Sequence, residues 1–163
     1  MVEIDDKYGY IDKEGKYVIN PQFDEAWPFY EGLAVVRIGD KWGYIDKEGK
    51  MVINPQFDEA WSFSEGLAVV RIGDWKSGKY GYIDKEGKYV INPQFDWVDS
   101  FSEGLAAVEI GRKWGYMDKE GKYVINPQFD YALCGFSEGL AEVVIDCKCG
   151  FINKEGKFVW REE

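Results

Sequence analysis

The sequence repeats one motif at a nearly constant interval, and this repetition limits the fold more than any other feature. A glycine of the motif, as in DKWGYIDKEGK, recurs at intervals of 34 (43−9), 38 (81−43), 34 (115−81) and 35 (150−115) residues. A period in this range is typical of solenoids and propellers, because one such unit cannot bury its apolar face alone. We therefore predict a single repeat domain over residues 1–163, with units at about 1–24, 25–58, 59–96, 97–130 and 131–163.

Each unit contains three segments with the pattern of β-strands. In the first, as in LAVVRIG, every second residue is apolar in each copy, as Ala34, Val36 and Ile38 are, which is the alternation of a half-buried strand. The segment D-K-E-G then links two further strands, because Asp at its first position and Gly at its fourth favour a hairpin turn. The sequence predicts a three-stranded antiparallel meander per unit, with the face of Ala34, Val36 and Ile38 directed inward and the end of the opposite face in water.

A connector that begins NPQFD joins one meander to the next. Proline ends strand pairing there because it has no N–H to donate. Connector phenylalanines such as Phe57 and Phe63 recur in every copy, so we expect them to fill the gap between successive units. Three glycines are also expected to be structural, namely Gly43, Gly49 and Gly115.

The predicted fold is all-β: five meanders in an open, solenoid-like stack. The chain begins and ends at the boundaries of a meander, whereas a propeller usually closes by combining strands from both chain ends in one blade. A small propeller-like ring is the alternative, in which the connector supplies a fourth strand to each unit. The sequence does not decide whether DEAWPF forms that strand.

The composition disfavours some partners and locations. The chain has 163 residues and a net charge of −10, which disfavours direct binding to nucleic acid. Its apolar runs are too short to cross a bilayer, and MVEIDDKYGYIDKEG lacks the basic and apolar regions of a signal peptide. We expect no membrane association and a cytoplasmic location, with a removed signal peptide as the alternative.

Three cysteines lie close together near the end of the sequence, at Cys134, Cys147 and Cys149. The chain has no His that could complete a mixed zinc site. We expect these cysteines to be small, buried apolar residues of a degenerate last unit rather than redox or metal-binding groups.

The motifs taken together resemble a known family. KWGYIDKEGK, NPQFD and FSEGLAVV recur together along essentially the whole chain, and Trp-Gly pairs occur at Trp42-Gly43 and Trp114-Gly115. This combination is similar to the bacterial WG-repeat family, also called KWG repeats, although Tyr8 and Tyr80 replace the Trp and Cys149 breaks the pattern. The resemblance implies a β-rich module, often in tandem and often fused to other domains, without an assigned catalytic activity.

The sequence offers few residues for catalysis. Triads built on imidazole are absent because the chain has no His. The acidic residues mostly recur at fixed repeat positions, which indicates structural roles, and D-K-E-G lacks the interleaved oxygen ligands of a calcium loop. We predict no enzyme activity, no cofactor and no metal site.

Function is expected where the units differ, in the connectors and in the four-residue insertion at 75–78. Aromatic residues make up 17% of the chain, and exposed Trp and Tyr side chains are suited to anchoring a partner. The alternative is that these rings close the core between units. The candidate partner-binding residues are Trp27, Trp61, Trp75, Lys76, Trp97 and Tyr131.

These features predict a non-catalytic protein–protein interaction module or scaffold whose partner is another protein. Two alternatives stay open. The acidic surface could imitate nucleic acid and inhibit a nucleic-acid enzyme, in which case binding must weaken as salt rises. The exposed aromatics could instead bind carbohydrate or the cell envelope, which titrations against glycans would reveal.

Overall fold

In a computed structural model that describes residues 1–163, the chain forms five antiparallel sheets. The first sheet contains β1 (Val2–Ile4), β2 (Lys7–Ile11) and β3 (Tyr17–Phe23). The second contains β4 (Glu25–Ala26), β5 (Ala34–Ile38), β6 (Lys41–Ile45) and β7 (Met51–Phe57). The third contains β8 (Glu59–Ala60), β9 (Ala68–Ile72), β10 (Lys79–Ile83) and β11 (Tyr89–Phe95).

The last two sheets follow the same order. The fourth contains β12 (Trp97–Val98), β13 (Leu105–Ile110), β14 (Lys113–Asp118) and β15 (Tyr123–Phe129). The fifth contains β16 (Tyr131–Ala132), β17 (Leu140–Ile145), β18 (Lys148–Asn153) and β19 (Phe158–Arg161). No helix that could span a membrane is found in the structure.

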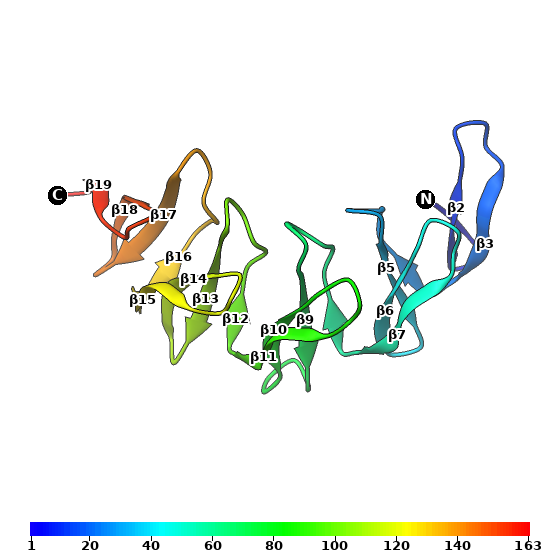
Figure 1. The fold of residues 1–163 in the computed structure, drawn as a ribbon, viewed down its shortest axis with the longest axis horizontal. Helices are drawn as coiled ribbons and strands as arrows, with labels where there is room; N and C mark the ends of the chain where they lie inside the picture. Colours follow the sequence, from blue (N-terminus) through cyan, green and yellow to red (C-terminus); the bar gives the residue numbers. More distant parts are fainter.

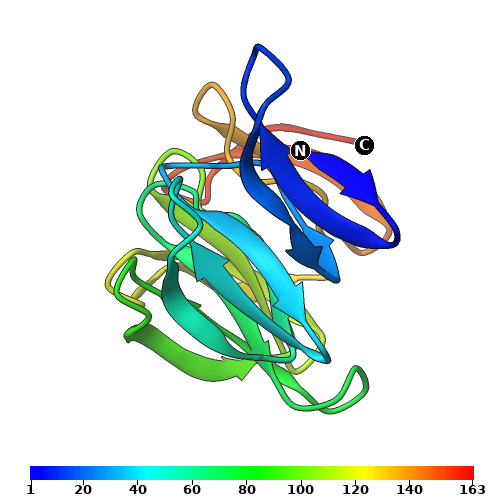
Figure 2. The ribbon, with the colours of Figure 1, turned by 90° about the vertical axis from the view of Figure 1, so that its right-hand side faces the viewer.

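The five sheets form an open stack. Figure 1 shows them in a row in chain order, with the two termini at opposite ends, and Figure 2 shows them one behind another along that row. The predicted solenoid-like stack of meanders is therefore confirmed, and the ring is not formed. The connector does add a fourth strand to the sheets that follow it, but a very short one. In the second sheet Glu25 of β4 pairs with Arg37 of β5, and β8, β12 and β16 pair with the next strand of their sheets in the same way.

The middle strands of each internal sheet are buried on both faces, because the sheet has a neighbour on either side. Val36 packs with Tyr10 of the first sheet, whereas Val35, on the opposite face of β5, packs in a cluster shared with the third sheet. Ala34 and Val36 are directed inward as predicted, but β5 is not half-buried, because Val35 on the opposite face is buried as well. Ile38 is 44% exposed despite its apolar pattern, because it lies at the turn where β5 ends. Phe57 and Phe63 are buried in the cluster between the second and third sheets.

Two positions of the repeat require glycine, each for a different physical reason. A Cβ on Gly43 would lie 2.5 Å from the carbonyl oxygen of Ile53, because β7 crosses close to β6 at a bulge; Gly115 meets β15 in the same way. Gly49 ends the D-K-E-G turn with φ +82°, a conformation that favours glycine, and its N–H donates to the carbonyl of Asp46. The predicted hairpin turn is thus present, and the Ile19 side chain of the preceding sheet packs directly over Gly49.

Acidic side chains of the repeat join neighbouring sheets. The Asp58 carboxylate accepts hydrogen bonds from Lys41 Nζ of the second sheet (2.6 Å) and from the Gly73 N–H of the third (2.8 Å). Glu31 accepts from the Gly66 N–H (3.0 Å) and pairs with Lys85 Nζ (3.2 Å), both in the third sheet. Recurrence of these residues at fixed repeat positions therefore reflects their roles at the junctions between sheets.

The expectation that the three cysteines are buried was wrong. Cys134 and Cys147 are exposed, Cys149 is half-buried, and all three are free thiols. Cys134 lies in a connector that is one residue longer than the others, and Cys147 lies in the tight turn between β17 and β18. Cys149 takes the place of Trp42 and Trp114 in the last sheet, where no further sheet covers it.

Candidate partner-binding site

Three aromatic rings gather at the edge of the stack where the third and fourth sheets meet. Trp61 follows β8, Tyr80 lies on β10, and Trp97 begins β12. Their ring centroids are 5.1 Å apart for Tyr80 and Trp97, 6.0 Å for Trp61 and Trp97, and 6.4 Å for Trp61 and Tyr80. Tilted and edge-to-face contacts between aromatic rings are stabilising, so they hold the three rings in place. Two of the predicted candidates, Trp61 and Trp97, are therefore brought into contact.

The Glu59 carboxylate holds two of these rings by hydrogen bonds. It accepts from Trp61 Nε1 at 2.8 Å, from Arg71 Nε at 2.9 Å and from the Tyr80 hydroxyl at 3.1 Å. Burial alone would raise the pKa of Glu59, but the three donors outweigh it and keep that pKa below its ordinary value. Burial and the neighbouring Glu59 carboxylate raise the pKa of Tyr80 to about 12. The pair is therefore a carboxylate facing a neutral phenol at physiological pH.

Trp27 forms the wall of an apolar hollow on the same edge. Trp27 follows β4, as Trp61 follows β8, and its side chain is 53% exposed. Between the two rings lies a space of about 260 Å³, and we name this the apolar hollow; it is lined by Trp27, Ala60, Trp61 and Ser62. Its lining is mostly apolar, so it can take an aliphatic or aromatic side chain of a ligand.

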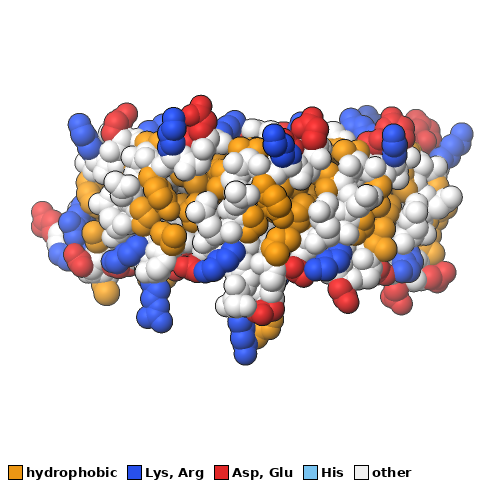
Figure 3. Space-filling view, turned by 60° about the horizontal axis from the view of Figure 1, so that its bottom comes forward, with side chains coloured by type: hydrophobic (Ala, Val, Ile, Leu, Met, Phe, Trp, Pro, Cys, Tyr) orange, Lys and Arg blue, Asp and Glu red, His pale blue; other side chains and the backbone are white.

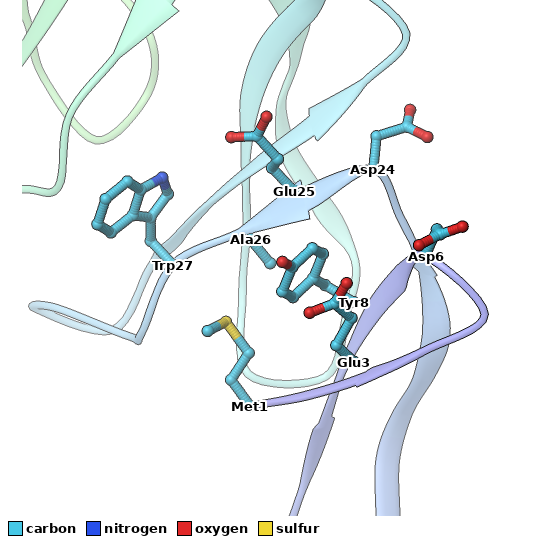
Figure 4. Close-up of a pocket in the computed structure, with 8 residues that line it drawn as sticks. All are labelled: Met1, Glu3, Asp6, Tyr8, Asp24, Glu25, Ala26 and Trp27. Atoms are coloured by element: carbon cyan, nitrogen blue, oxygen red, sulfur yellow. The ribbon is translucent and has the colours of Figure 1, made fainter.

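On the other side of Trp27 lies a larger hollow with acidic walls. Its volume is about 490 Å³, and we name it the acidic hollow; it is lined by Met1, Glu3, Asp6, Tyr8, Asp24, Glu25, Ala26 and Trp27. Figure 4 shows the Tyr8 ring beside Ala26 and Glu3, with Trp27 across the hollow from Asp6. Trp27 therefore separates two spaces of different chemistry.

The acidic hollow keeps negative charge after its ion pairs are counted. Asp24 pairs with Lys7, and Glu25 pairs with Arg37 at 2.6 Å. The Lys7 ammonium holds the pKa of Asp24 below its ordinary value. Glu3 and Asp6 make no ion pair, and the Glu3 carboxylate raises the pKa of the Tyr8 phenol. A cationic side chain entering the hollow would find carboxylates and a neutral aromatic ring.

The remaining candidates lie apart from this edge cluster. Trp75 is 79% exposed in the loop between β9 and β10, and Lys76 Nζ lies 4.9 Å from its ring centroid. Asp74 orders this loop by accepting from the N–H groups of Lys76 and Ser77. Trp75 makes no ring contact with Trp61, and Tyr131 is exposed on β16, one junction further along the stack.

The sequence reasoning missed Tyr80, Glu59, Arg71 and both hollows. Strand register carries the missing signal, because Glu59 pairs with Arg71 and Arg71 with Tyr80, so the three side chains share one face. The reasoning also missed exposed apolar pairs at the start of the third meander strands, at Tyr17-Val18, Tyr89-Val90, Tyr123-Val124 and Phe158-Val159. Figure 3 shows hydrophobic side chains in bands along one face of the stack, with charged side chains along its edges.

Comparison with known proteins gives one match. A family model described as WG containing repeat matches residues 8–42, 42–74, 80–114 and 114–149. These matches leave out residues 75–79, which contain the insertion with Trp75 and Lys76. No curated protein matches the chain. The structure contains no group of three or more His, Cys, Asp or Glu side chains arranged to hold a metal ion.

Proposed function

The chain belongs to the WG-repeat family, and we propose that it is a non-catalytic module that binds another protein along the edge formed by β4 and β8. One observation supports this most directly: an exposed Trp27 stands between an apolar hollow and an acidic hollow. Trp is the side chain most enriched among residues that dominate binding energy at protein interfaces. The edge is also built by a rigid scaffold, because Glu59 and Tyr80 fix Trp61 before any partner arrives.

The two hollows define the chemistry of the partner. An apolar side chain of the partner would enter the space between Trp27 and Trp61, and a lysine or arginine would enter the acidic hollow beside Glu3 and Asp6. The cation would meet the Tyr8 ring as well as carboxylates, which adds a cation–π contribution. We therefore propose an extended protein segment that carries an apolar and a basic residue close together. The net charge of −10 would accelerate its approach.

A peptide display selection against the protein tests this function. We expect enriched peptides to combine a basic with an apolar residue. Truncating Trp27 to Ala should weaken their binding about 30-fold, which is the effect of losing about 2 kcal/mol at a central anchor. Trp75→Ala is the matched control, because it removes an exposed Trp from a loop away from both hollows.

The charge contribution needs a separate variant. Glu3→Gln with Asp6→Asn removes two carboxylates that make no ion pair, so the fold should persist while binding of basic peptides weakens and becomes less sensitive to salt. Peptides that bind equally well to the wild type and to Trp27→Ala would refute this binding surface. If no peptide is enriched, but the protein binds particular glycans on an array and Trp27→Ala abolishes that binding, carbohydrate would instead be favoured as the ligand.

A further inference from the structure

The junctions between sheets repeat one polar contact, and at the ends of the stack its Glu and its Lys have no ion-pair partner. In each contact a Glu carboxylate accepts from a Gly N–H and pairs with a Lys of the next sheet. The sets are Glu31 with Gly66 and Lys85, Glu65 with Gly104 and Lys119, and Glu103 with Gly139 and Lys154. Glu138 has the same backbone conformation, with φ 53°, but no ion pair. Lys13 occupies the equivalent Lys position on the first sheet and is exposed.

The outer faces of the end sheets expose residues whose equivalents are buried at every internal junction. On the fifth sheet, Phe151 is 38% and Trp160 is 54% exposed, whereas the equivalent Tyr44 and Ile53 are 0% and 3% exposed. On the first sheet, Ile11 is 37% exposed, whereas Ile45 at the same place in the second sheet is fully buried. The fifth sheet therefore presents the side that an internal sheet turns towards its successor, and the first sheet presents the meander part of the opposite side, without a connector.

We propose that the outer face of the fifth sheet binds the outer face of the first sheet of a second copy of this chain. Glu138 of one copy would pair with Lys13 of the other, as Glu31 pairs with Lys85 inside the stack. Trp160 would cover the turn at Gly15, as Ile19 covers Gly49, because a Cβ on Gly15 would meet no neighbouring atom within 4 Å. Such a contact uses two different surfaces, so it continues along the stack axis and does not close after two copies.

Some residues of the end faces differ from their equivalents at the internal junctions, and these differences make the proposed contact weaker than an internal junction. Glu142 stands where Val35 lies in the second sheet, so docking would bring a carboxylate towards an apolar face. Phe151 lacks the hydroxyl with which Tyr44 donates to the Trp61 carbonyl. The first sheet consists of β1, β2 and β3 alone, so no connector carbonyl lies opposite Phe151 in the proposed contact. Association should therefore be reversible and should increase with concentration.

Charge exchange across the proposed contact provides the test. Glu138→Lys places like charges opposite each other in one variant, and Lys13→Glu does so in a second. Both positions are exposed, so both variants should fold as the wild type does, which circular dichroism would verify. In sedimentation velocity the wild type should form higher oligomers as concentration rises, and each variant alone should stay monomeric. An equal mixture should form higher oligomers again, because every contact between the two variants joins opposite charges.

Two further variants separate this contact from general stickiness. Glu142→Val removes the carboxylate that the proposed contact would bury. It should lower the concentration at which half of the chains are associated about tenfold or more, whereas Trp75→Ala, off both end faces, should not change it. A wild type and a Glu142→Val variant that both stay monomeric at the highest attainable concentration would overturn the proposal. A mixture of the two charge variants that stays monomeric, or association unaffected by either charge reversal, would overturn it as well.

Discussion

Replacing Gly43 by Ala should destabilise the protein although it adds only one methyl group. The added Cβ would lie 2.5 Å from the Ile53 carbonyl oxygen and 2.7 Å from the backbone nitrogen of Pro55. Ordinary contact begins at 3.4 Å, so the two backbones would have to separate by about 0.9 Å (3.4−2.5). Both atoms belong to the backbone of a bulged strand, which cannot rotate away as a side chain can.

The expected loss of stability follows from two opposing effects. Overfilling a packed site of this kind costs about 1 to 3 kcal/mol. Replacing Gly by Ala also restricts the unfolded chain, which stabilises the fold by about 0.4 to 1 kcal/mol. We therefore expect a net loss of about 1 to 2 kcal/mol, or a decrease of several degrees in the melting temperature for a chain of this size.

Urea unfolding of Gly43→Ala and Gly135→Ala provides the comparison. Gly135 has a negative φ and its nearest neighbour, the Ser102 Cβ, would lie 3.4 Å from the added atom, so this variant should be neutral or slightly stabilised. Gly43→Ala should lower the urea midpoint with an unchanged slope, because only the folded state is affected. Equal midpoints for the two variants would refute the conclusion that close backbone approach explains the glycine of the Trp-Gly pair.

Three more predictions follow from the packing and the charges. Phe101→Ala should cost about 3 to 5 kcal/mol in urea unfolding, because it empties a buried site between the third and fourth sheets. Tyr82→Phe should cost about 1 kcal/mol by removing the hydroxyl that donates to the Asp99 carbonyl at 2.7 Å, whereas Tyr123→Phe, which removes an exposed hydroxyl without such a bond, should cost almost nothing. The Lys41 ammonium lowers the pKa of Asp58 from its ordinary 3.8, and neighbouring Lys residues do the same for the Asp residues at equivalent positions, so their stabilisation is complete above that value and is lost as pH falls through the lower folded pKa. The urea midpoint should therefore fall steeply only below about pH 4, and Asp58→Asn should reduce part of that fall; a midpoint that declines evenly from pH 7 would contradict the assignment.

Much of the fold follows from the sequence because each unit repeats the same local signals. The D-K-E-G turns, the alternation in the first strand and the Asn-Pro boundary each restrict a short stretch of backbone, and four or five copies reinforce the prediction. The alternation of apolar residues did not predict the burial of Val35, because a period-2 pattern describes a strand with one buried and one solvent-exposed face. In a stack of sheets both faces of the middle strands meet a neighbour, as the burial of Val35 and Val36 in different clusters shows.

The candidate site was predictable only in part. Trp27, Trp61 and Trp97 stand out in the connectors, but their grouping with Tyr80 depends on how a two-residue strand joins the following sheet. Two residues carry too little pattern to predict a strand. Register, once known, places Glu59, Arg71 and Tyr80 on one face, and only then does the hydrogen-bonded support of Trp61 become visible.

Connector side chains at this edge can differ between units without disturbing the junctions, because a backbone carbonyl makes the junction contact there. The Tyr10, Tyr44 and Tyr82 hydroxyls each donate to a carbonyl of the next connector, at Trp27, Trp61 and Asp99. Every residue has a carbonyl, so this bond constrains the position but not its side chain. The same place can therefore hold Trp in two units and Asp in a third while the stacking stays intact. Side chains at such positions can vary without loss of the stacking contact, which is the physical reason for seeking function on this edge rather than on the uniform apolar pairs of the third strands.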